Sequence, residues 1–196
     1  MDTYRFPVIA AITAIFTLPL LVAIALVVGS ENGRALDNMI HVTGVFSVWI
    51  LMFCIASSPL AALAEPWPDL KRIALDLRIL EVALLAAFMP AHVILFVIEK
   101  SDWEVVTLSA FQPRFVFGWL AFGILLPILA AAAGTAVRRG NRARPWMDTA
   151  LWGGAVVVTA HWWLSKGQAA PLIALQLAPF VVLEGLRLRK ILATRT

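Results

Sequence analysis

The sequence predicts an all-α integral membrane protein, with one transmembrane domain over 1–196 built as a six-helix bundle and both termini in the cytoplasm. An excess of apolar residues, six apolar stretches and a one-sided distribution of Lys and Arg lead to this prediction. Hydrophobic residues make up 61% of the 196 positions and charged residues 14%, whereas a soluble domain carries roughly a quarter charged residues. This composition excludes a soluble globular protein, a disordered chain and a secreted disulfide-rich module.

Six apolar stretches each approach the roughly 20 residues that a helix needs to cross the bilayer core. In chain order they cover about 6–28, 40–63, 75–98, 115–137, 147–164 and 169–186. Gly, Pro, Asn and charged residues fill the breaks between them, as connections require. The first stretch is too long for the apolar core of a signal peptide, so we predict a retained helix. Only Lys166 and Gly167 separate the last two stretches.

The distribution of Lys and Arg orients the six predicted spans. One side receives Arg5, Lys71, Arg72, Arg78, Arg138, Arg139, Arg142, Arg144, Arg187, Arg189, Lys190 and Arg195. The other side receives only Arg34, Lys100, Arg114 and Lys166. The positive-inside rule places the richer side, and with it both termini, in the cytoplasm. The positive charge therefore indicates topology and not nucleic-acid binding, and the lipid bilayer is the first partner of this chain.

The histidines are the candidate functional residues. In this topology His41, His92 and His161 lie on three different spans, each within roughly 6–11 Å of the outer boundary at about 1.5 Å rise per residue. Ionisable groups inside a membrane are costly and face the bundle interior, and neutral imidazole is the usual protein ligand of haem iron. Two histidines at one depth on facing helices would suit the axial ligation of a haem b.

Two other interpretations of the histidines remain open from spacing alone. A single histidine in a spanning helix more often hydrogen-bonds to a neighbouring helix than binds a metal. A zinc site is the competing metal hypothesis, and it is the weaker one because no outer carboxylate cluster or HxxxH pair accompanies the three histidines.

The segments around two of the histidines resemble a known family. The run from Arg78-Ile79-Leu80-Glu81 to Pro90-Ala91-His92 is similar to the third helix of the ferric reductase-like transmembrane cytochrome b proteins. It is most similar to the haem-binding membrane subunit of the periplasmic methionine sulfoxide reductase system. Ser57-Ser58-Pro59-Leu60 and His161-Trp162-Trp163-Leu164-Ser165-Lys166 resemble two further motifs of that family. The resemblance covers about 40–190.

The resemblance implies that His92 and His161 are the axial ligands of a haem near the outer face. His41 is then dispensable for ligation and could hydrogen-bond a haem propionate. Family members carry another histidine thirteen residues before the one aligned with His161, where this chain has Asp148. Ile79, at the other inner position, cannot bind iron. We therefore expect one haem b on the outer side and none in the inner leaflet.

Two carboxylates fall in the inner half of the predicted membrane, Glu81 and Asp148. Intramembrane carboxylates are functional candidates by default, here for handling a quinol proton. The alternative, which we favour, is a structural ion pair of these carboxylates with Arg78.

These observations predict an electron-transfer subunit more than a catalyst acting alone. Such a b-type cytochrome of the bacterial inner membrane would take electrons from the quinone pool or a cytoplasmic flavin donor and pass them to a periplasmic oxidoreductase. The alternative is a haem-free accessory or assembly subunit of a membrane complex that retains the fold. A transporter is less favoured, because the sequence shows neither an internal repeat nor paired broken helices.

Overall fold

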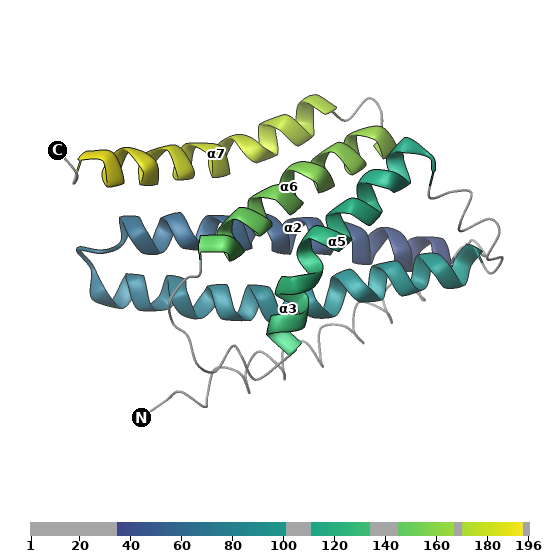
Figure 1. Cartoon of the computed structure of the whole chain (residues 1–196), viewed down its shortest axis with the longest axis horizontal. Helices are drawn as coiled ribbons and strands as arrows, with labels where there is room; N and C mark the ends of the chain where they lie inside the picture. Colours follow the sequence, from purple (N-terminus) through teal and green to yellow (C-terminus); the bar gives the residue numbers. More distant parts are fainter. Residues whose placement is uncertain (1–34, 101–110, 134–144, 167–169, 194–196) are drawn as a thin grey trace.

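The computed structural model describes residues 35–100, 111–133, 145–166 and 170–193 (Figure 1). Within these ranges the chain forms five helices and no strand. The helices are α2 (Ala35–Leu63), α3 (Pro68–Lys100), α5 (Pro113–Ala133), α6 (Pro145–Lys166) and α7 (Ala170–Ala193). The all-helical fold class is therefore confirmed for this part of the chain. The predicted span over 6–28 lies outside the described residues.

The other five predicted stretches each fall on one helix, in the expected order. The helices are in general longer than the apolar stretches, because they continue into flanking residues that are polar or charged. Three of them, α3, α5 and α6, begin at proline. Proline is favoured at the first helical position, where its fixed φ suits the helix and its missing N–H has no partner to lose.

Two of the described helices are long and apolar enough to cross a membrane, over Leu36–Leu63 and Pro68–Glu99. A shorter apolar helical segment covers Pro113–Ile128. Large apolar side chains also lie exposed on the described helices, including Val182 at 60% and Ile94 at 57% exposure. The described part of the chain thus suits a membrane environment.

The helices associate as two antiparallel hairpins with α7 against one of them. Helix α2 packs along α3, and α5 packs along α6, while α7 contacts mainly α2 (Figure 1). A turn at 64–67 joins the first hairpin. Over the described residues the backbones of α3 and α6 do not come close to each other. Helices α2 and α5 therefore provide the packing between the two histidine-bearing helices.

The core fills the space between the two hairpins. Its largest fully buried side chains include Leu51 of α2, Leu85 and Phe88 of α3, Leu125 of α5 and Leu151 of α6. Close packing continues at Gly154 of α6, where an added Cβ would lie 2.6 Å from a methyl carbon of Leu125. Gly154 therefore serves close packing between α5 and α6.

Candidate functional site

His92 lies near the C-terminal end of α3 and is held by the first turns of α2. Its Nδ1 atom is 2.9 Å from the carbonyl oxygen of Ile40 and 3.4 Å from the hydroxyl of Thr43. A carbonyl oxygen only accepts hydrogen bonds, so Nδ1 carries the proton and donates. The Nε2 atom of the neutral ring is then left with a lone pair.

His161 is held in the same way by a different helix. Near the C-terminal end of α6, its Nδ1 atom donates to the carbonyl oxygen of Arg114, in the first turn of α5. In the neutral ring, its Nε2 atom then carries the lone pair. We find no hydrogen bond to Nε2 of either His92 or His161 within the residues that the structure describes. Both rings thus present a lone pair of the kind that a metal accepts.

The structure brings the three predicted histidines to one end of the bundle. His92 lies within electrostatic range of both His161 and His41. His41 is exposed on α2, directly after the residue whose carbonyl holds His92. Their common depth, which was inferred from three separate spans, therefore corresponds to spatial proximity.

An aromatic contact joins the two histidine-bearing hairpins at this end. The rings of Phe96 and Phe115 are 5.1 Å apart between centroids. Phe96 lies one helical turn after His92, and Phe115 directly follows the residue whose carbonyl holds His161. The guanidinium of Arg114 lies 4.6 Å from the centroid of the Phe115 ring. Within the described ranges, no three His, Cys, Asp or Glu side chains gather in a group that could hold a metal ion directly.

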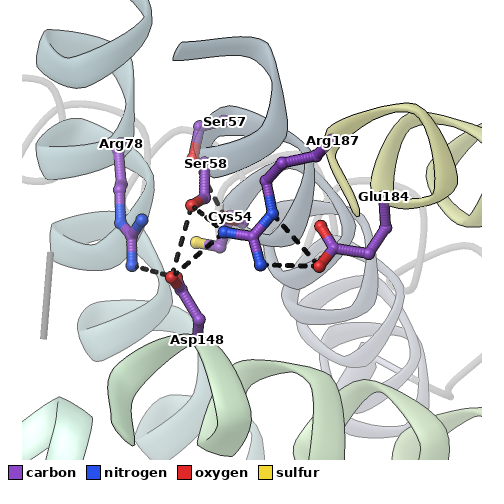
Figure 2. A network of polar contacts seen from close by, with 7 residues as sticks. All are labelled: Cys54, Ser57, Ser58, Arg78, Asp148, Glu184 and Arg187. Atoms are coloured by element: carbon purple, nitrogen blue, oxygen red, sulfur yellow. Dashed lines mark hydrogen bonds and ion pairs between the residues drawn. The ribbon is translucent and has the colours of Figure 1, made fainter. Parts of the chain in front are cut away.

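A second polar cluster lies around Asp148, in the first turn of α6 (Figure 2). The carboxylate of Asp148 accepts a hydrogen bond of 2.6 Å from Arg78 of α3 and one of 3.3 Å from Ser58 of α2. Arg187 of α7 lies 3.8 Å from the same carboxylate and pairs with Glu184 at 2.7 Å. We call these five residues the Asp148 network. It connects four helices through one mostly buried carboxylate.

A cavity of about 1020 Å³ adjoins the Asp148 network. Its remaining lining is mainly apolar and includes Leu75, Ile124, Trp152 and Val157. Asp148 and His161 are thirteen residues apart on α6, about 20 Å of helix at 1.5 Å rise per residue. The cavity follows α6 from Asp148 to Val157, one helical turn before His161, and no histidine is among the described residues that line it.

The predicted ion pair of Arg78 and Asp148 is confirmed. Glu81 does not join it in the described structure: its carboxyl group lies beside the Ser57 hydroxyl. One of its oxygens, Oε2, is buried without a hydrogen-bond partner among the described residues. The prediction was wrong in placing Glu81 in the pair, because its side chain faces α2 and not α6.

Sequence reasoning missed Ser58, Glu184 and Arg187. Arg187 was counted only as one of the charges that orient the spans. Glu184 carried a usable signal, since an acidic residue inside an apolar stretch is costly unless it has a partner, and Arg187 lies three residues after it on the same helical face. Ser58 was named only as part of a motif of the family resemblance, and its hydrogen bond to Asp148 was not predicted.

Comparison of the chain with family models, with curated proteins and with solved structures found no match. The resemblance to the ferric reductase-like proteins therefore remains an expectation from the sequence motifs. The positions of His92 and His161 and the hydrogen bonds of their Nδ1 atoms are the basis of the proposed function.

Proposed function

We propose that the chain is the haem b-binding, electron-transfer subunit of a membrane oxidoreductase system. One observation carries the proposal: His92 and His161 lie at one end of the bundle, and each donates its Nδ1 proton to a backbone carbonyl. Metal-bound histidines almost always donate their other ring N–H to such an acceptor, which fixes the tautomer and the ring orientation. The two imidazoles are thus prepared as ligands through Nε2.

The arrangement of the helices suits a group held between these two imidazoles. His92 and His161 belong to α3 and α6, whose backbones do not come close to each other over the described residues. Their positions are instead determined by α2 and α5, whose carbonyls hold the rings. Haem b, when bound, supplies a reversible one-electron couple, whose potential depends on axial ligands, burial and hydrogen bonds.

The proposal includes the predicted topology of six spans, with both termini in the cytoplasm of a bacterium and the histidines near the outer face. The distribution of Lys and Arg supports this orientation. Electrons would then come from the quinone pool or a cytoplasmic flavin donor. A periplasmic oxidoreductase, or another subunit of a membrane complex, would receive them near the outer ends of α3 and α6.

The Asp148 network supports a single haem. The resemblance places a second family histidine at Asp148, and this carboxylate is already committed to Arg78 and Ser58. In the described residues that surround the inner cavity, we find no imidazole to replace it. The inner end of the bundle is therefore stabilised by charge pairing.

An absorption spectrum of the full-length protein tests the proposal. The protein is produced with added haem precursor, purified in detergent and examined together with its pyridine haemochrome. We expect the spectrum of a low-spin b-type cytochrome with up to one haem per chain. A monodisperse protein without a Soret band would overturn the proposal and favour the haem-free accessory subunit.

A further inference from the structure

The imidazoles of His92 and His161 each rest against a glycine. A Cβ added at Gly44 of α2 would lie 2.8 Å from Cε1 and 3.1 Å from Nδ1 of His92. A Cβ added at Gly118 of α5 would lie 3.2 Å from both Cε1 and Nδ1 of His161. Real Cβ atoms essentially never approach other atoms as closely as the first of these distances. Each ring therefore occupies space that any other residue would fill.

The glycines bear the same relation to the carbonyl groups that hold the rings. Ile40 and Gly44 are four residues apart on α2, and Arg114 and Gly118 are four residues apart on α5. Residues with this spacing lie one above the other on a single face of an α-helix. An imidazole that donates to the carbonyl of Ile40 or Arg114 therefore passes over the residue four positions later. Glycine at that position has no side chain to obstruct the ring.

The two hairpins are consequently built alike around their histidines. In each, the first helix provides a carbonyl and a glycine four residues later, and the second helix provides the histidine near its end. The sequence shows no repeat, because the arrangement depends on one glycine and one histidine per hairpin in otherwise different segments. The contact between Phe96 and Phe115 joins the two units.

We propose that Gly44 and Gly118 are positioning residues that set the orientation and tautomer of His92 and His161 in a two-sided imidazole site. A methyl group at Gly44 must displace the ring of His92, and a methyl group at Gly118 must move the ring of His161 by a few tenths of an ångström. The displacement alters the hydrogen bond that keeps the proton on Nδ1 and the direction in which Nε2 points. For its ligand, this inference rests on the proposed haem function.

Two other glycines provide matched controls. A Cβ at Gly123, on the same helix as Gly118, meets nothing within 4 Å. A Cβ at Gly154 meets only Leu125 among its nearest atoms, at 2.6 Å. Gly123→Ala therefore tests the change of residue type, and Gly154→Ala tests tight packing that involves no imidazole.

The first experiment measures haem affinity and spin state in Gly44→Ala, Gly118→Ala and the two controls. We expect each of the first two variants to bind haem about 10-fold or more weakly, as loss of an orienting contact to a metal ligand typically does, and to show a high-spin fraction. Gly123→Ala should match wild type. Gly154→Ala should lower thermal stability while the haem that remains bound stays low-spin. Wild-type spectra in both Gly44→Ala and Gly118→Ala would overturn the inference.

The second experiment needs no haem and separates this inference from the proposed function. Nitrogen-15 NMR of labelled histidines in the haem-free, full-length protein reports which ring nitrogen carries the proton. We expect Nδ1–H rings for His92 and His161 in wild type, with Gly44→Ala changing only His92 and Gly118→Ala only His161. If Gly44→Ala does not fold, Gly118→Ala, with its longer contact, decides the outcome. If both variants keep the wild-type tautomers, the positioning role is overturned. If wild type shows Nδ1–H rings but binds no haem, only the proposed function is overturned.

Discussion

The guanidinium of Arg78 lies 2.6 Å from the carboxylate of Asp148 and links α3 to α6. These helices carry His92 and His161, and in the described structure their backbones do not come close to each other. Both charged side chains are largely buried, with 10% and 16% of their surface exposed. The two histidine-bearing helices are thus connected by an ion pair at a distance from the histidines.

Replacing Asp148 with Asn should destabilise the protein. Removing one partner of a buried ion pair leaves the other charge without compensation, which costs about 3 kcal/mol. Asp148 also serves Ser58 and approaches Arg187, so its loss affects several helices together. Reversible unfolding in detergent measures the change in the free energy of unfolding.

The double variant Arg78→Gln with Asp148→Asn is the control for this prediction. It removes both charges, so its cost should be smaller than the sum of the two single costs. A single Asp148→Asn variant within about 0.5 kcal/mol of wild type, the range of an ordinary surface substitution, would show that the network does not stabilise the bundle.

His92→Ala and His161→Ala should each abolish bound haem or leave it five-coordinate. Each variant removes one of the two rings whose Nδ1 donates to a carbonyl. His41→Ala should retain a low-spin spectrum, because His41 lies exposed beside the site. Electron paramagnetic resonance of the oxidised protein distinguishes these states. Loss of haem in His41→Ala together with a low-spin spectrum in His161→Ala would show that the ligand pair is different.

The helices were predictable because a chain in lipid has few alternatives. A bilayer offers no water to pair with backbone groups, so an apolar stretch of spanning length must form a helix or a closed barrel. The position of the three histidines at one end of the bundle was predictable from their places along the predicted helices, at about 1.5 Å rise per residue. Both predictions depend on residue type and on position along the chain, which the sequence contains.

The roles of Gly44, Gly118 and Arg187 were not predictable in the same way. Each depends on what faces it from another helix: a ring from α3, a ring from α6, and a carboxylate from α6. Residue type alone does not distinguish Gly118 from Gly123, although only the former meets an imidazole. These roles follow from which faces of two helices meet, and the sequence alone does not contain that information.

Purified protein should hold at most one haem b per chain, and Asp148→Ala should leave that number unchanged. Asp148 is engaged by Arg78, and Ile79 has no atom that binds iron. The ratio of haem to protein from the pyridine haemochrome and amino-acid analysis gives the stoichiometry. Two haems per wild-type chain would require an inner ligand that we have not identified, and the single-site description would be abandoned.

Helix α7 should loosen from the bundle in acid. Lys190 of α7 donates to the carboxylate of Glu65 and to the carbonyl of Ala62, both at 2.7 Å. The hydrogen bond and positive charge of Lys190 lower the pKa of Glu65 from its ordinary value of 4.5. A lowered folded-state pKa contributes stability that is fully present above the ordinary value and is lost as the pH falls through the folded-state pKa.

Amide hydrogen exchange of 187–193, corrected for the intrinsic rate, should therefore accelerate in wild type below about pH 4.5. In Glu65→Gln the same amides should exchange faster at neutral pH and show little further change in acid; parallel pH profiles for the two proteins would show that this ion pair does not fasten α7.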